Sequence, residues 1–210
     1  MAIPRFPVYV FDVDGTLVDS APDIAGAVQQ VMARHTSEPL PFEYVRSFIG
    51  FHLDAIFMKH LPHYTREQLD EMIADYRTTY WALEHAGTTA FPGALEAVSA
   101  LGGRKSTATT KGTPTTKIVL EKFGFLPYFE HVQGTDGFPA KPEPDVILRS
   151  MAGLNAKPEE CLMIGDSPAD MEAGRRAGVK ICAVRYGYGS EADLARFEPD
   201  YWVSDLRELL

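Results

Sequence analysis

The residues with the clearest capacity for chemistry are Asp12 and Asp14, which follow an apolar run of strand length at Val8–Phe11. Since alternate residues of a strand project to the same side, this spacing predicts two carboxylates side by side. Gly15 comes next, and a glycine lets the backbone turn away because it tolerates positive φ. Two adjacent carboxylates repel each other. A bound cation would relieve that repulsion, and a division of labour between a nucleophile and an acid–base group would use it.

A calcium-binding loop is excluded as the explanation of this acid pair. Such a loop needs a glycine at its sixth position and a glutamate at its twelfth. Counted from Asp12, these positions hold Leu17 and Asp23. We therefore interpret the pair together with the other polar residues of the chain.

Further polar residues follow later strand candidates along the chain. Thr109, Lys141 and the pair Asp166 and Asp170 each come at or soon after the end of a predicted strand. Singly, they have ordinary explanations: a strand threonine, a solvated loop lysine, and a carboxylate that favours a helix N-terminus. Because ligands of parallel sheets bind outside the carboxyl ends of the strands, the ordered series predicts one site at that edge.

The elements that must position these residues alternate between strands and helices in the second half of the chain. Strands are expected at Val8–Phe11, up to Thr109, and at His131–Gln133, Cys161–Ile164, Lys180–Val184 and Tyr201–Val203. Helices are expected at Ala94–Leu101, from Thr113 to Gly124, at about Asp145–Ala152, from Pro168 to Gly178, and after Val203. This alternation predicts an α/β fold, with a Rossmann-like parallel sheet core and helices on both faces.

Residues 18–89 contain helix patterns only. Helix starts are predicted by Ser20, an N-cap followed by Pro22, and by the capping box of Thr65 and Gln68. Shorter helices are expected at about 42–49 and 53–61, and no strand is expected anywhere in the segment. The pattern predicts an inserted all-helical cap domain at 18–89, with a core domain made of 1–17 and 90–210.

The composition is that of a globular protein of 210 residues, 45% hydrophobic and 23% charged. Pro4, Arg5 and Pro7 interrupt the N-terminal apolar run, so neither a signal peptide nor a membrane-spanning helix is expected. A net charge of −9 argues against broad binding to nucleic acids or anionic membranes, so an anionic substrate needs local cations or a metal. Cys161 and Cys182 lie in apolar runs without metal-ligand spacing, which predicts buried thiols of a cytoplasmic protein.

Four segments resemble, in order, the motifs of the haloacid dehalogenase superfamily: 12–20 (DVDGTLVDS), 108–111 (ATTK), 141–144 (KPEP) and 164–170 (IGDSPAD). The helical insert directly after the first segment is similar to that of the phosphoglycolate phosphatase-like members. The resemblance implies a magnesium-dependent hydrolase of phosphoric ester bonds, which acts on a small phosphorylated metabolite such as phosphoglycolate through an aspartyl-phosphate. Asp14 favours this phosphatase branch, since expelling an alkoxide needs an acid whereas dehalogenation does not.

Carried over residue by residue, the resemblance makes Asp12 the nucleophile and Asp14 the acid for the leaving group, then the base for water. Thr109 and Lys141 would hold the phosphoryl oxygens. The implied magnesium ligands are the carboxylates of Asp12 and Asp166, the backbone carbonyl of Asp14, and Asp170 directly or through water. The chemistry agrees, because a carboxylate approaches a phosphate dianion only where cations offset the charge.

The segment before Thr109 departs from the family pattern, which usually has an apolar strand where this chain has residues 104–106 (RKS). Thr109 is preferred to Thr107 because Lys111 completes a family-like Thr-x-Lys spacing. Thr110 takes the place where many relatives have asparagine, and we expect it to bind substrate as well.

Residues 48–53 (FIGFHL) resemble the loop that such caps lower into the active site. Gly50 would supply its turn, and Arg46 and His52 are candidate contacts for the leaving group, although each could also be a solvated surface residue. Inorganic pyrophosphatase stays open as a function, since a small pyrophosphatase branch has a similar loop and a Thr-Thr-Lys motif. A phosphosugar mutase and a non-catalytic binding module are further alternatives. We expect a monomer or a homodimer.

Overall fold

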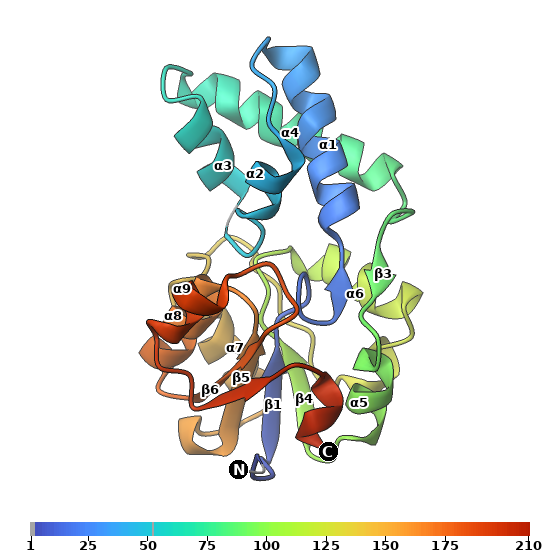
Figure 1. Cartoon of the computed structure of the whole chain (residues 1–210), viewed down its shortest axis with the longest axis vertical. Helices are drawn as coiled ribbons and strands as arrows, with labels where there is room; N and C mark the ends of the chain where they lie inside the picture. Colours follow the sequence, from blue (N-terminus) through green and yellow to red (C-terminus); the bar gives the residue numbers. More distant parts are fainter. Residues whose placement is uncertain (1–2, 52) are drawn as a thin grey trace.

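The computed structural model describes residues 3–51 and 53–210 and has a five-stranded parallel sheet at its centre (Figure 1). The strand order is β4-β1-β5-β6-β7, with bounds Arg104–Thr107 (β4), Val8–Phe11 (β1), Cys161–Gly165 (β5), Lys180–Val184 (β6) and Tyr201–Val203 (β7). Phe11 lies opposite Thr107 on one side and opposite Ile164 on the other. The ends of β4 and β5 therefore deliver their following residues beside those of β1.

Side chains of β1 alternate between two hydrophobic cores, one on each face of the sheet. Tyr9 and Phe11 pack in the core that includes α5, α6 and η3, whereas Val8 and Val10 pack in the core of α7, α8 and α9. The bounds are Ala94–Ala100 (α5), Thr113–Lys122 (α6), Asp145–Gly153 (α7), Pro168–Ala177 (α8), Glu191–Ala195 (α9) and Leu206–Leu209 (η3). The predicted parallel sheet with helices on both faces is confirmed.

Four further helices lie together beyond the carboxyl ends of the strands, at the top of Figure 1. They are α1 (Ala21–His35), α2 (Phe42–Arg46), α3 (Leu53–His60) and α4 (Arg66–Ala82). We call them the helical bundle. They share a separate hydrophobic core, in which Val28, Phe57 and Met72 are buried. The bundle is joined to the sheet by the chain segments before α1 and after α4.

The two long helices of the bundle, α1 and α4, begin where they were predicted to begin, but only one has the expected side-chain cap. The capping box of Thr65 and Gln68 at the start of α4 is confirmed. α1 begins after Ser20 as predicted, but the Ser20 side chain makes no capping hydrogen bond. Its hydroxyl donates instead to Asp14 at 2.6 Å. The N-cap position of Ser20 and the proline in the first turn are confirmed, whereas the side-chain capping bond is not formed.

The two chain segments that join the bundle to the sheet pair with each other. β2 (Val18–Asp19) and β3 (Thr89–Ala90) run antiparallel, with Val18 opposite Ala90 and Asp19 opposite Thr89. The expectation that residues 18–89 contain no strand was wrong at both ends of the segment. The pairing arises because the outgoing and returning chain run side by side.

The polar strand that departs from the family pattern lies at the edge of the sheet. β4 ends at Thr107, two residues before the predicted end at Thr109. Lys105 is tolerated within it because its ammonium group reaches backbone carbonyls, including that of Gly103 at 3.2 Å. The strand predicted at His131–Gln133 is reduced to a single bridge between Ser106 and His131.

The structure also contains short elements that the sequence pattern did not indicate. They are α9 and two 3-10 helices, η1 (Leu126–Tyr128) and η2 (Pro158–Glu160). Each is too short to show a clear hydrophobic period. No helix within 3–51 or 53–210 is both long and apolar enough to span a lipid bilayer.

Candidate active site

The carboxyl ends of β1 and β5 bring the first two acids together. β1 ends at Phe11 and β5 at Gly165, and the two strands pair in the sheet. The amide of Asp12 donates to the carbonyl of Ile164 at 2.9 Å, which extends the pairing by one residue. Asp12 and Asp166 therefore leave neighbouring strands at the same edge, and both are buried.

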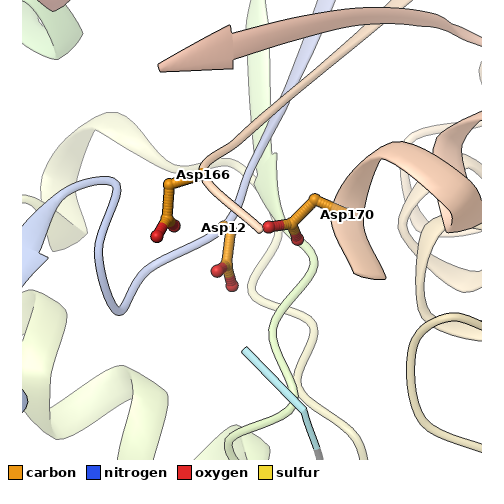
Figure 2. Close-up of side chains that lie close together, drawn as sticks. All are labelled: Asp12, Asp166 and Asp170. Carbon is orange, nitrogen blue, oxygen red and sulfur yellow. The ribbon is translucent and has the colours of Figure 1, made fainter. Parts of the chain in front are cut away.

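The first turn of α8 brings Asp170 to the same place. Ser167 and Asp170 form a reciprocal capping box, in which the Asp170 carboxylate accepts from the Ser167 amide at 2.9 Å and from its hydroxyl at 2.6 Å. Carboxylate oxygens of Asp12, Asp166 and Asp170 lie within 4.8 Å of one another (Figure 2). The structure thus brings together three of the four residues that the sequence analysis assigned to a metal.

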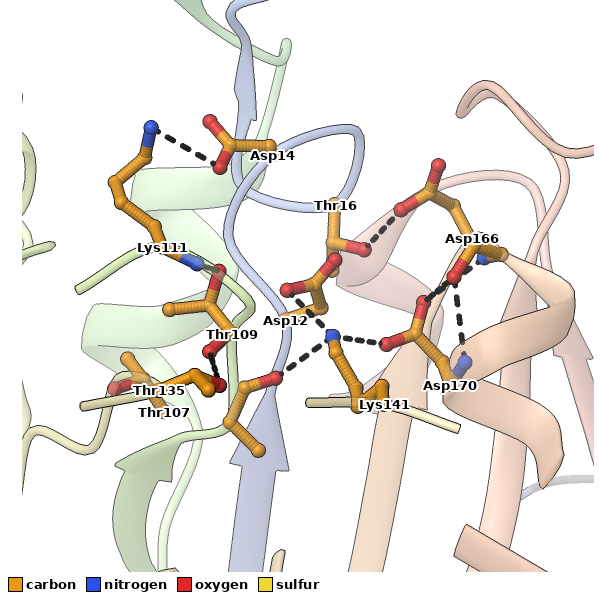
Figure 3. A network of polar contacts seen from close by, with 12 residues as sticks. Asp12, Asp14, Thr16, Thr107, Thr109, Lys111, Thr135, Lys141, Asp166 and Asp170 are labelled. Carbon is orange, nitrogen blue, oxygen red and sulfur yellow. Dashed lines mark hydrogen bonds and ion pairs between the residues drawn. The ribbon is translucent and has the colours of Figure 1, made fainter. Parts of the chain in front are cut away.

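Lys141 supplies a positive charge to this cluster (Figure 3). Its Nζ lies 2.9 Å from Asp12 Oδ1 and 2.5 Å from Asp170 Oδ1, and it donates to the carbonyl of Ala108 at 2.9 Å. Burial lowers the pKa of Lys141, but Asp12 and Asp170 outweigh burial and raise this pKa above its usual range. Lys141 is therefore a buried cation held between two carboxylates, and not a solvated loop residue.

The cluster carries more negative than positive charge. Burial and the nearby Asp170 raise the pKa of Asp12 to about 7, against the opposing effect of Lys141. Burial, Asp170 and Asp12 raise the pKa of Asp166 well above its usual value. Three carboxylates facing one ammonium group leave an excess of negative charge that a divalent cation would offset. Mg²⁺ prefers oxygen ligands, so this donor set fits it.

Asp14 lies apart from the three acids and faces a lysine that the sequence analysis did not place in the site. Its Oδ1 accepts from the Ser20 hydroxyl, and its Oδ2 lies 3.3 Å from Lys111 Nζ. Lys111 also donates to the Tyr80 hydroxyl at 2.9 Å and lies 4.6 Å from the centre of that ring. Lys111 therefore connects Asp14, which lies above the ends of the strands in Figure 3, with α4 of the bundle.

Thr109 and Thr110 follow β4 at the same edge of the sheet. Thr109 is buried, and its hydroxyl accepts from the amide of Lys111 at 3.3 Å. Thr107 lies within the strand, where its hydroxyl donates to the carbonyl of Gln133 at 3.0 Å and accepts from its amide at 2.9 Å. Those two bonds tie the Thr107 hydroxyl to the backbone of Gln133. Thr109 therefore remains the better candidate for a ligand contact.

The predicted substrate loop packs against the core at the start of α8. Gly50 has φ of +104°, which agrees with the predicted glycine turn. A Cβ at Gly50 would lie 2.8 Å from the side chain of Ser167, so only a glycine permits this approach. His52 lies outside the described residues.

Arg46 contacts a core loop that reaches the carboxylate cluster. Its guanidinium lies 5.2 Å from the centre of the Tyr188 ring, and its Nη2 donates to the carbonyl of Gly187 at 3.3 Å. The amide of Tyr188 donates to Asp166 at 2.8 Å, and its hydroxyl donates to Asp19 at 2.9 Å. Tyr188 therefore joins an acid of the cluster to the strand that leads into the bundle.

A cavity of about 410 Å³ lies between the bundle and the core. Asp14, Thr110 and Lys111 line it from the core, and Gly50 and Tyr80 line it from the bundle. The cavity therefore extends from Asp14 toward the bundle.

Comparison with known proteins agrees with this arrangement. Residues 9–184 match the family model described as haloacid dehalogenase-like hydrolase. The chain belongs to this family. The match contains all four segments that carry the resemblance in the sequence.

Proteins of known name extend the family assignment over the whole chain. The chain is similar to "Phosphoglycolate phosphatase 1" of Pseudomonas aeruginosa, with 31% identity over 99% of this chain and 79% of that protein. It is also similar to a phosphoglycolate phosphatase of Aquifex aeolicus, with 32% identity over 97% of this chain and 94% of that protein.

Solved structures of the family have the same fold. A haloacid dehalogenase-like family hydrolase from Streptococcus pneumoniae matches with a TM-score of 0.87 and 27% identity, over 97% of this chain and 96% of that one. A protein from Clostridium acetobutylicum described as a predicted phosphatase matches with a TM-score of 0.90 and 28% identity, over 98% and 97% of the two chains.

This member of the haloacid dehalogenase-like hydrolases has contacts around its acids that sequence reasoning missed. Besides Lys111 and Tyr188, the hydroxyl of Thr16 donates to Asp166 at 2.9 Å. Because Thr16 lies within the first motif, its place in the sequence could have indicated that it contacts the site. Tyr188 follows a strand in a glycine-rich stretch, where the pattern alone does not indicate which carboxylate its amide will reach.

Proposed function

We propose that this protein is a magnesium-dependent phosphatase that hydrolyses small phosphate monoesters, such as phosphoglycolate, through an aspartyl-phosphate on Asp12. Its membership of the family and its relatives named phosphoglycolate phosphatase make it a hydrolase of phosphoric esters. The observation that carries the mechanism is the buried cluster in which Lys141 lies between Asp12 and Asp170, next to Asp166.

The metal would be held by the carboxylates of Asp12, Asp166 and Asp170, with the backbone carbonyl of Asp14 as a further ligand. When bound, Mg²⁺ supplies positive charge that lets a carboxylate and a phosphate dianion come together. The Thr16 hydroxyl and the Tyr188 amide each donate to Asp166, so they hold that carboxylate in one orientation.

Asp12 acts as the nucleophile. A carboxylate oxygen of Asp12 forms a bond to phosphorus while the bond from phosphorus to the ester oxygen breaks. Lys141 holds this carboxylate at 2.9 Å, and its charge partly offsets the charge of the incoming phosphoryl group. Thr109 and Thr110, at the end of the neighbouring β4, bind phosphoryl oxygens together with Lys141.

Asp14 moves the protons. It gives a proton to the departing alcohol, and it takes one from the water that then hydrolyses the aspartyl-phosphate. Ser20 and Lys111 contact one oxygen each, so both hold the Asp14 side chain beside the cavity where the leaving group lies. Each cycle therefore returns Asp12 and Asp14 to their starting states.

Residues 18–89, which contain the helical bundle, act in this proposal as a cap domain on a core of 1–17 and 90–210. Arg46, Gly50 and His52 are its proposed contacts to the leaving group. We place the enzyme in the cytoplasm, since Cys161 and Cys182 are free and buried, and we expect a monomer or homodimer.

The test compares the wild-type enzyme with Asp12→Asn and with Asp70→Asn, an exposed acid of the bundle, as the matched control. Wild type and Asp70→Asn should hydrolyse phosphoglycolate and an aryl phosphate in Mg²⁺ but not in excess chelator. Asp12→Asn should lose turnover of both while keeping its circular dichroism spectrum. Mass spectrometry of acid-quenched enzyme should find a phosphoryl adduct in wild type and in Asp70→Asn, but not in Asp12→Asn. Full turnover in Asp12→Asn, or in chelator, would reject the proposal.

A further inference from the structure

The cavity between the bundle and the core has two chemically different walls. The wall from the core consists of polar residues and glycine: Asp14, Thr110, Lys111, Gly112, Thr115, Thr135, Asp136 and Gly137. The wall from the bundle is apolar or aromatic apart from Gly50 and Arg77: Ile24, Val28, Val45, Phe48, Ile49, Phe51, Ile56, Ile73, Tyr76, Tyr80 and Trp81. A molecule that spans the cavity therefore meets polar groups at one end and an apolar surface at the other.

One face of α4 forms much of the apolar wall. Ile73, Tyr76 and Tyr80 follow the helical spacing of three and four residues, so they share a face, and Trp81 lines the cavity next to Tyr80. The rings of Tyr76 and Tyr80 stack with centroids 5.7 Å apart and an angle of 13° between planes. Tyr80 is buried and Lys111 lies 4.6 Å from the centre of its ring, so the half-buried Tyr76 provides the aromatic surface of this pair that a ligand can contact.

The rest of the apolar wall comes from the interior of the bundle. Val28, Val45, Ile56 and Ile73 belong to the bundle's own hydrophobic core and also line the cavity. These four side chains are nearly fully buried, whereas Ile24, Phe48 and Phe51 of the same wall are half-buried and offer apolar surface to the cavity. Covering that surface with apolar atoms of a ligand is favourable, because apolar surface is removed from water.

The charges in the cavity do not match a strongly anionic occupant. Among the described lining residues the cations are Lys111 and Arg77. Lys111 already contacts Asp14 and the Tyr80 hydroxyl. Away from Arg77, a carboxylate placed against the bundle wall would lose its hydration without gaining a charged partner, which is costly.

We propose that this cavity binds an apolar leaving group, so that the enzyme hydrolyses phosphate monoesters of alkyl or aryl alcohols in addition to small anionic esters. The ester oxygen lies at Asp14, and the alkyl or aryl group extends along α4. The volume of about 410 Å³ is within the range of ~300–1,000 Å³ typical of sites for small organic molecules. This inference rests on the proposed function, since it specifies the group on the far side of the ester bond.

The test uses ethyl, butyl and hexyl phosphate, whose alkanol leaving groups are alike in acidity. Any change along this series therefore reports the apolar contact and not the ease of bond cleavage. Burial of each added methylene should raise kcat/KM roughly two- to fourfold, which amounts to roughly 16- to 250-fold from ethyl to hexyl phosphate. Most of the gain should appear in KM, because the contact is the same in the bound substrate and the transition state.

A pair of variants in the bundle locates the contact. Trp81→Ala removes a large side chain of the wall that is 42% exposed, so its loss should not unfold the bundle. It should lower kcat/KM for hexyl phosphate about fivefold more than for ethyl phosphate. Met58→Ala is the control: Met58 is also an exposed apolar residue of the bundle, at 53%, but is not among the lining residues. It should leave the hexyl-to-ethyl ratio unchanged.

The outcomes separate the inference from the proposed function. If ethyl phosphate is hydrolysed with dependence on Asp12 but the series is flat or falls with length, the inference is wrong and the phosphatase assignment stands. Equal effects of Trp81→Ala and Met58→Ala on the ratio would also overturn the inference. If no ester is hydrolysed at all, the proposed function fails, and the inference fails with it.

Discussion

The buried carboxylate of Asp12 should make the metal-free protein lose stability as the pH rises. Burial, with Asp170 close by, raises the pKa of Asp12 from 3.8 to about 7 in the folded state. Between these two values the folded protein holds a proton that the unfolded chain has released. The stabilisation is therefore complete below the unfolded value and is lost as the pH rises through about 7.

The size of this effect follows from the number of protons involved. One extra proton on the folded state changes the free energy of unfolding by about 1.4 kcal/mol per pH unit. From pH 5 to pH 7, Asp12 alone should therefore lower the stability by about 2–3 kcal/mol. The pKa of Asp166 is also raised by burial, so its contribution has the same sign.

The assay is urea denaturation at pH 5, 6 and 7 in excess chelator, for wild type and Asp12→Asn. The pKa values of His85 and His131 are lowered by burial, so these groups favour the folded state as pH rises and oppose the trend. Their contribution is common to both proteins and cancels in the difference. Saturating Mg²⁺ should flatten the wild-type curve, since it favours the charged carboxylates.

The comparison has one decisive outcome. The difference in stability between wild type and Asp12→Asn should shrink or reverse from pH 5 to pH 7, because only wild type loses the stabilising proton. Parallel pH profiles of the two proteins in chelator would refute the assignment of a buried, protonated Asp12 in the metal-free state.

Two further predictions concern the leaving group. Asp14→Asn should lower kcat/KM for alkyl phosphates more than for nitrophenyl phosphate, because an alkoxide needs a proton to leave and nitrophenolate does not. Equal losses across a leaving-group series would argue against Asp14 as the acid. Arg46→Ala should lower kcat/KM for phosphoglycolate much more than for an aryl phosphate, whereas Arg34→Ala, at an exposed arginine paired with Asp75, should affect neither. Equal effects of Arg46→Ala on both substrates would remove Arg46 from substrate selection.

The meeting of Asp12, Asp166 and Asp170 could be foreseen from the sequence because it depends on topology alone. Each acid follows a strand or starts a helix, and parallel strands end at one edge whatever their side chains are. Ser167 and Pro168 also indicate the start of the helix whose first turn carries Asp170. Local rules therefore sufficed to bring these three together.

The surroundings of Asp14 could not be foreseen in the same way. Ser20 is the N-cap of α1, and the common role of a serine there is to accept a hydrogen bond from the first turn through its side chain, which it does not do. Its actual partner, and the contact from Lys111 to Tyr80, depend on how the bundle is oriented over the sheet. Contacts between side chains of the bundle and of the core do not produce a hydrophobic period in either segment, so the sequence pattern does not predict them.

The paired strands β2 and β3 have a consequence for how this protein can change. Asp19 and Thr89 lie opposite each other in this antiparallel pair, so the chain leaves the core and returns to it through two hydrogen-bonded strands that lie side by side. A tight two-residue turn could close the chain there, since antiparallel strands need no longer connection. The helical bundle can therefore be replaced through these two strands without altering the register of β1 and β5, the strands that lead to Asp12 and Asp166.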